Sequence, residues 1–155
     1  MFSTILVATD GSHESLYVVN VATEEALRHN AALHIICVTN PGDVQQMLVN
    51  PHTDAIDVNY ELIAKHLAEE AKKALEDAEK EAENIGLSII PHLVWGEPRE
   101  EILRCAEEIG ADCIVVGSTG KTGLEELLLG SVSSGIVTLA RTNTMIIRIK
   151  GEGII

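Results

Sequence analysis

Aromatic residues and cysteines are scarce in this 155-residue chain. Aromatics account for 3% of the residues against 46% for all hydrophobic types, so we expect a core built from Ile, Val, Leu and Ala. The three cysteines are odd in number, show no C-x-x-C spacing and lie among apolar residues, which favours reduced core thiols over disulfides or zinc ligands. The six histidines share no ligand spacing, so we expect no metal cluster.

Basic residues are also few: 11 Lys and Arg stand against 24 Asp and Glu, for a formal net charge of -13. Such a charge repels phosphate backbones and anionic headgroups, which disfavours nucleic acid and membrane surfaces as partners. A phosphate-bearing ligand would need local backbone dipoles instead. The Glu- and Lys-rich stretch from Glu69 to Glu83 indicates a solvated helix face. No export signal follows Met1, so we expect a cytoplasmic protein.

Short apolar runs rich in β-branched residues alternate with helical patterns, which indicates an α/β protein. Three of the runs are almost continuously apolar, as parallel strands covered on both faces must be. Right-handed crossovers then predict a three-layer, doubly wound sandwich with a five-stranded parallel sheet in the order 3-2-1-4-5. We expect one domain over residues 1–155. The predicted strands are Thr4 to Ala8, Leu33 to Thr39, Leu87 to Trp95, Cys113 to Gly117 and Asn143 to Ile149.

Four helical patterns lie between the predicted strands. Ser12 is placed to cap the first, Pro98 to begin the third and Gly110 to end it, while Gly135 interrupts the last. The region from Asn40 to Asp57 holds two prolines, a glycine and no sustained periodicity, so we expect a long loop there. The predicted helices cover about residues 12–29, 59–85, 98–109 and 131–140.

Two short segments meet at the predicted switch point, where the first and fourth strands are neighbours. One is Asp10 with the Gly and Ser that follow it; the other reads Gly117-Ser-Thr-Gly120, then nine residues, then Gly130-Ser131. Glycines allow backbone N–H groups to turn towards an anion, and a helix start adds partial positive charge. The second segment therefore indicates a phosphate cradle, although a tight turn followed by a helix cap would use the same glycines.

The segment Gly120-Lys121-Thr122 also invites comparison with the Walker A loop, G-x-x-x-x-G-K-[ST]. The first glycine of that loop would be residue 115, which is Val115 inside a predicted strand. No helix opens directly behind Thr122 either. The pattern therefore does not predict a P-loop.

The spacing G-x2-G-x9-G-[ST], together with an N-terminal apolar strand that ends in Asp-Gly-Ser, resembles the signature of the ATP-binding universal stress proteins. The resemblance covers the whole chain and implies the adenine nucleotide alpha hydrolase-like fold. At the nucleoside end it implies that Asp10 contacts the nucleoside, that Ala8 and Thr9 line the adenine pocket, and that the backbone of Val38 meets the adenine edge.

At the phosphate end, the resemblance assigns a second group of residues. Gly117, Gly120 and Gly130 are implied to lie along the ribose and phosphates, and Ser131 and Val132 to hold the terminal phosphates. The bound ATP is implied to carry Mg²⁺ or Mn²⁺ on its phosphates, with no direct protein ligand to the metal. No catalytic residue is assigned.

The resemblance implies a nucleotide-dependent regulatory or stress-response homodimer, joined through Asn143 to Ile149, with an unidentified regulatory partner protein and with binding favoured over turnover. Two alternatives stay open: a slow ATPase or nucleotidyl-transfer enzyme that uses Asp10, Ser131 and a metal ion, and a dimerisation module without nucleotide. The chain departs from the family pattern in Ser133-Ser-Gly135, where bulkier residues are common.

Overall fold

A computed structural model of the protein describes residues 1–49, 60–118 and 129–149. Its five strands form one parallel sheet in the order β3-β2-β1-β4-β5, which confirms the predicted topology. The strands are β1 (Thr4–Ala8), β2 (Ala32–Thr39), β3 (Ile90–Trp95), β4 (Cys113–Gly117) and β5 (Asn143–Ile147). The helices are α1 (His13–His29), α2 (Pro41–Val49), α3 (Tyr60–Ile85), α4 (Pro98–Ile109) and α5 (Ser131–Leu139).

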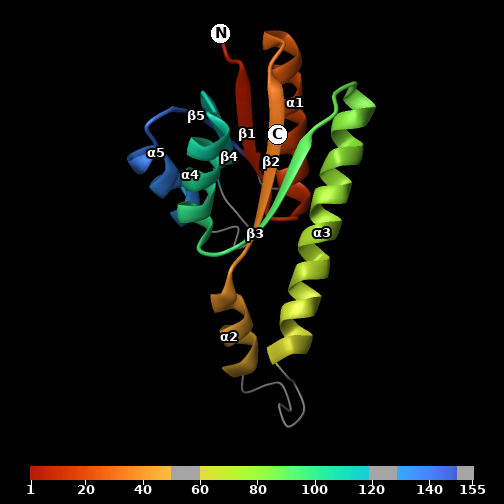
Figure 1. Ribbon diagram of the computed structural model, residues 1–155, viewed down its shortest axis with the longest axis vertical. Helices are drawn as coiled ribbons and strands as arrows, with labels where there is room; N and C mark the ends of the chain where they lie inside the picture. The colour runs from red at the N-terminus through yellow and green to blue at the C-terminus, as the bar shows by residue number, and fades with distance from the viewer. Residues whose placement is uncertain (50–59, 119–128, 150–155) are drawn as a thin grey trace.

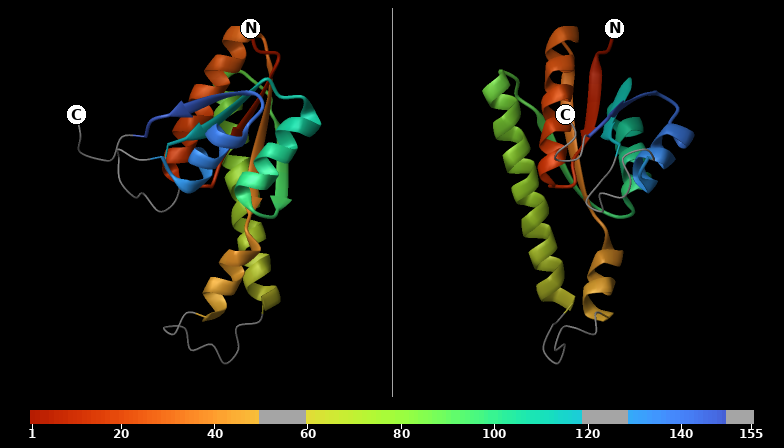
Figure 2. Two further views of the ribbon diagram at one scale, coloured as in Figure 1. Left: turned by 90° about the vertical axis from the view of Figure 1, so that its left-hand side faces the viewer. Right: turned by 180° about the vertical axis from the view of Figure 1, so that it is seen from behind.

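Helices cover both faces of the sheet, with α1 and α3 on one side and α4 and α5 on the other (Figures 1 and 2). The central strands therefore send alternate side chains into two cores. Along β1, Ile5 and Val7 enter the core under α1 and α3, whereas Leu6 enters the core under α4 and α5. This is the predicted three-layer, doubly wound sandwich. In the described part of the chain, each helix is too short or too polar to cross a bilayer.

The expected loop from Asn40 to Asp57 was wrong over its first part, because Pro41–Val49 forms α2. Proline fits the first position of a helix, where its missing N–H costs no hydrogen bond. Asn40 stands just before it, and its Oδ1 accepts a hydrogen bond from the Gly42 N–H at 2.9 Å. Val44 is fully buried, and α2 packs beside the first half of α3 (Figure 1). Residues 50–57 lie outside the described ranges.

Two strand boundaries differ by two or more residues from those predicted, and the second strand begins one residue earlier than predicted, at Ala32. The third strand begins at Ile90 instead of Leu87, because Gly86 and Leu87 close α3: both N–H groups donate to the Ala82 carbonyl at 3.0 Å, and Gly86 has a φ of 111°. The last strand ends at Ile147, two residues earlier than predicted. The helices predicted around α1, α3, α4 and α5 are confirmed to within one residue at each end.

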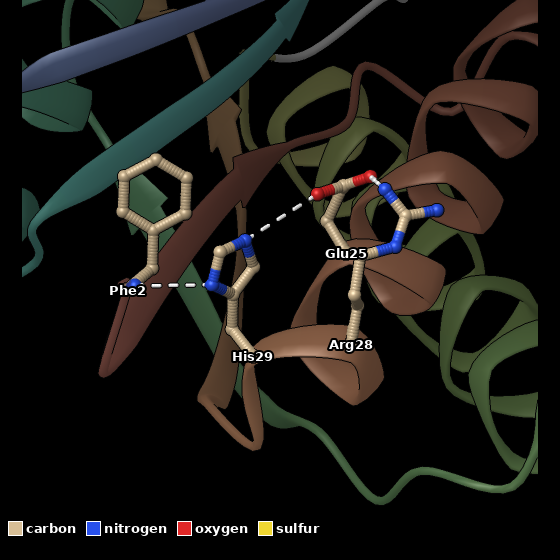
Figure 3. Close-up of polar contacts among 4 residues, drawn as sticks. All are labelled: Phe2, Glu25, Arg28 and His29. Carbon is tan, nitrogen blue, oxygen red and sulfur yellow. Dashed lines mark hydrogen bonds and ion pairs between the residues drawn. The ribbon is translucent and has the colours of Figure 1, made fainter.

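A polar cluster at the amino end of the sheet ties the start of the chain to the end of α1 (Figure 3). The Phe2 N–H donates to His29 Nδ1 at 3.3 Å, and the two rings lie 4.8 Å apart. With Nδ1 as the acceptor, the ring proton of neutral His29 lies on Nε2, which faces Glu25 at 3.6 Å. Glu25 also accepts a hydrogen bond from Arg28 at 2.6 Å. This cluster anchors β1 at the end opposite the switch point.

A histidine pair joins β2 to the edge strand β3. His34 Nδ1 and His92 Nε2 lie 2.9 Å apart, and the two rings are stacked with centroids separated by 5.2 Å. Burial, followed by the nearness of His92, lowers the pKa of His34 below its ordinary value of 6.5. The hydrogen bond needs one ring as acceptor, so the two rings are not both protonated while it is made, and the lowered pKa favours the neutral form of His34.

We expect Gly11→Ala to destabilise the protein by about 1–3 kcal/mol, because Gly11 has a φ of 80° and an added Cβ would lie 3.0 Å from the Ala74 Cβ. Gly110→Ala is the matched control: its φ is 65°, but nothing lies within 4 Å of the added Cβ. Urea denaturation should show a larger loss for Gly11→Ala than for Gly110→Ala. Equal losses would contradict the close packing of α3 on this turn.

We also expect the protein to lose stability as the pH falls from about 7 to about 5. The unfolded state takes up a proton at His34 below pH 6.5, whereas the lowered pKa delays this uptake in the folded state. Thermal unfolding across this range should depend less on pH in His34→Gln than in the wild type, and His92→Gln should act in the same direction. An identical pH dependence in all three proteins would contradict the assignment.

Candidate functional site

A cavity of about 640 Å³ opens at the carboxyl ends of β1, β2 and β4, at the switch point of the sheet. Eight of the nine residues predicted for the site line this cavity, and Gly120 lies outside the described residues, as do Lys121 and Thr122. The structure thus brings together segments that are more than 100 residues apart in the chain. Their part in ligand binding stays a prediction. The eight are Ala8, Thr9, Asp10, Val38, Gly117, Gly130, Ser131 and Val132.

The turn after β1 is held by its own side chains. Asp10 Oδ1 accepts a hydrogen bond from the Ser12 N–H at 2.9 Å, which fixes the carboxylate at the edge of the cavity. Thr9 Oγ1 accepts from the Gly11 N–H at 3.3 Å and bonds to Ser15 Oγ at 2.8 Å. The Thr9 hydroxyl is therefore engaged within the protein.

The end of β2 offers backbone groups to the cavity. The Thr9 N–H donates to the Ile36 carbonyl at 2.9 Å, so Ile36 directs its backbone groups towards β1. Val38 is two residues further along the strand and directs its N–H and carbonyl to the same side. Because β1 ends at Ala8, these groups lie beyond the last paired residue of β1. Val38 thus presents a donor and an acceptor at the cavity wall.

The start of α5 faces the cavity without a side-chain cap. Gly130 is the N-cap residue, and no side-chain hydrogen bond caps the helix. The first hydrogen bond of the helix runs from the Ser134 N–H to the Gly130 carbonyl at 2.9 Å. The N–H groups of Ser131, Val132 and Ser133 precede it, and no described residue accepts a hydrogen bond from them. They form a cluster of donors beside the cavity.

Three other helices differ from α5 at their starts. In α1 the Ser15 N–H donates to Ser12 Oγ at 3.2 Å, and in α4 the Glu100 N–H donates to Glu97 Oε2 at 2.9 Å. The helix α2 begins beside the Asn40 side chain. All three carry an acidic residue in the first turn, whereas α5 carries none. The positive end of the α5 dipole is therefore not offset by an acid of its own first turn.

The outer wall of the cavity comes from α3, where the sequence predicts a solvated face from Glu69 to Glu83. Glu70, Lys73 and Asp77 line this wall, on the same side of the helix as the buried Ala71 and Ala74. Their spacing of three and four places them at the border between the buried and exposed faces. The sequence alone carries no signal that this border meets a cavity, because that depends on the angle at which α3 crosses the sheet.

Gly135, which interrupts the predicted last helix, is explained by a contact with α4. A Cβ at this position would overlap the side-chain carbons of Arg99, which lies across α5 there. The missing side chain therefore leaves room for Arg99 to lie against α5. Pro98 at the start of α4 and Val132 in the first turn of α5 both line the cavity.

The cysteines and histidines add no reactive centre to the described residues. All three cysteines are buried and outside disulfides, and burial raises the pKa of Cys105 and of Cys113 to about 11. Within the described ranges, no group of three or more His, Cys, Asp or Glu side chains is arranged to hold a metal ion.

The fold and the cavity together define a doubly wound α/β protein with a cluster of N–H donors at its switch point. The chain belongs to the universal stress protein family, whose model matches residues 1–148. Universal stress protein MJ0531 of Methanocaldococcus jannaschii is 35% identical over 148 residues, which cover 96% of this chain and 83% of that protein.

Solved structures show the same architecture. The structure of the hypothetical protein MJ0577 is similar with a TM-score of 0.80 and 27% identity, covering 98% of this chain and 99% of that one. A universal stress protein in complex with cAMP is similar with a TM-score of 0.69 and 26% identity, covering 96% of this chain and 98% of that one.

We expect Gly130→Asp to stabilise the nucleotide-free protein by about 0.5–1 kcal/mol, because the new carboxylate can accept from an N–H of the first turn and offset the helix dipole. Gly130 has a φ of -61° and a ψ of 164°, an extended conformation open to any residue. Gly130→Asn, which caps without charge, should stabilise by less. Urea denaturation at low salt measures both changes, and a loss of stability in both variants would contradict an uncapped α5.

Proposed function

We propose that the protein binds an adenine nucleotide, preferentially ATP, in the cavity at the switch point and acts as a nucleotide-dependent regulatory protein. The observation that carries the proposal is the uncapped start of α5, where the N–H groups of Ser131, Val132 and Ser133 face a cavity and find no described acceptor. A phosphate group supplies the missing acceptors and the negative charge that a helix start favours. With a net charge of -13, the protein needs local backbone dipoles to hold a phosphate, and the start of α5 supplies them.

The nucleoside end of the proposed ligand lies towards β1 and β2. The Val38 N–H and carbonyl match the alternating acceptor and donor on the edge of an adenine ring, and Asp10 is fixed nearby as an acceptor for ribose hydroxyls. The apolar side chains of Ala8 and Ile102 complete the wall that a flat base would contact. The cAMP complex of a family member supports an adenine nucleotide as the ligand class.

A divalent cation fits the proposed complex. Asp10, Asp43, Glu70 and Asp77 line the cavity, and these carboxylates would repel a triphosphate. Mg²⁺ or Mn²⁺ on the phosphates would offset this repulsion, with oxygen ligands that both ions accept. Lys73 lines the same wall and supplies one positive charge.

We further propose a homodimer joined through the last strand, with the regulatory partner protein still to be identified. The strand β5 is the outer strand of the sheet, so its free edge can pair with the same strand of a second copy. The strand also offers apolar side chains to a second copy, since Met145 and Ile147 are only partly buried within one chain.

Calorimetry with Mg-ATP tests the proposed binding. The wild-type protein should bind, and Gly130→Asp should lower the affinity by roughly 100-fold or more, because its carboxylate competes with and repels the phosphates. Gly130→Asn is the matched control, with nearly the same shape and no charge, and should lose much less. Adenosine, which has no phosphates, should bind wild type and Gly130→Asp alike. No detectable ATP binding by the wild type would refute the proposal.

The same preparation distinguishes a binding protein from an enzyme. We expect steady-state phosphate release from Mg-ATP to stay well below about 1 per second, an ordinary enzymatic rate. Release at or above that rate would favour the alternative of an ATPase or nucleotidyl-transfer enzyme.

A further inference from the structure

Ser118 stands directly after β4 and makes hydrogen bonds in two directions. Towards β5, its N–H donates to the Ile147 carbonyl at 2.9 Å, and its hydroxyl oxygen accepts from the Ile149 N–H at 3.1 Å. Towards α5, its carbonyl accepts from the Gly130 N–H at 2.8 Å and from Ser133 Oγ at 3.3 Å. One residue thus contacts both the end of the edge strand and the start of the helix.

Ser133 completes this arrangement inside the first turn of α5. Its hydroxyl lies 3.3 Å from the Ser118 carbonyl and 3.1 Å from the Gly130 carbonyl, so its single proton is directed between the two. Ser118 is 2% exposed and Ser133 is 3% exposed. Loss of the Ser133 hydroxyl would leave the Ser118 carbonyl with only the Gly130 N–H and the Gly130 carbonyl with only the Ser134 N–H, so the start of α5 would be held by fewer buried hydrogen bonds.

These hydrogen bonds hold in place two of the residues that line the cavity. Gly130 and Ile149 both line it, and each is held there by a hydrogen bond to Ser118. Ser133 also lines the cavity, but its hydroxyl is directed at the Ser118 and Gly130 carbonyls, while its own N–H belongs to the uncapped first turn. The two serine hydroxyls are thus engaged in holding Gly130 and Ile149, which line the cavity.

We infer that Ser118 and Ser133 are positioning residues that aim the first turn of α5 at the phosphates and couple that turn to the end of the edge strand β5. The inference rests on the proposed nucleotide binding and adds a route for its regulation. A phosphate that holds the first turn of α5 restrains Gly130, and through Ser118 it restrains Ile149. In the reverse direction, a partner or second copy that pairs with β5 alters the phosphate end of the site.

Alanine variants test the positioning role. Ser133→Ala should weaken Mg-ATP binding by about fivefold to tenfold, the effect of one lost hydrogen bond, while adenosine affinity stays unchanged. Ser134→Ala is the matched control, since Ser134 is the neighbouring serine and is exposed. Unchanged ATP affinity in Ser133→Ala, or an equal loss for ATP and adenosine, would overturn the inference.

Amide hydrogen exchange tests the coupling and does not require nucleotide. Without ligand, Ser118→Ala should speed exchange of the Ile149 amide, and Ser133→Ala should speed exchange of the Gly130 amide. Adding Mg-ATP to the wild type should slow exchange at Ile149, and this slowing should be lost in Ser118→Ala. If wild type binds no ATP, the proposed function fails, but unchanged exchange in both variants would separately overturn the positioning role.

Discussion

The N–H groups at the start of α5 constrain the rest of the structure. A helix always leaves its first N–H groups without partners inside the helix, and three other helices of this protein satisfy or offset them with their own side chains. At α5 the cap residue is Gly130, which has no side chain to offer. These N–H groups therefore require an acceptor from outside the helix, and the cavity lets an anion reach them. In the proposed complex of this acidic protein, these dipoles take the place of lysine and arginine in holding the phosphates.

The remainder of the fold places this helix start in a usable site. Parallel strands bring Asp10, Val38 and Gly117 to one end of the sheet, and the early end of β1 uncovers the backbone of Val38. The missing side chain of Gly11 lets α3 pack against the turn after β1 and close the outer wall. Buried bonds from Ser118 then connect the helix start to β5. The proposed nucleotide binding and the proposed pairing at the sheet edge would thus share a set of hydrogen bonds.

The sequence predicted the sheet order and four helices correctly, because these depend on local periodicity, caps and the handedness of crossovers. It does not predict α2, because Pro41 and Gly42 are typical loop residues, although the Asn40 side chain caps a helix that contains them. Eight predicted site residues line one cavity, because the spaced glycines mark the end of β4 and the start of α5, which the fold brings together. The α3 wall and the Ser118 network could not be predicted, because they depend on tertiary packing and hydrogen-bond geometry that no local pattern records.

The most direct measurement of the central claim is the response of individual backbone amides to Mg-ATP in nuclear magnetic resonance spectra. The account predicts that the amide resonances of Ser131, Val132 and Ser133 shift most strongly on binding. The first turn of α4 is the internal reference, because Glu97 already caps it, and its Glu100 amide should shift little. Saturating nucleotide that leaves the α5 amides unmoved would contradict the account, since the phosphates would then be held elsewhere.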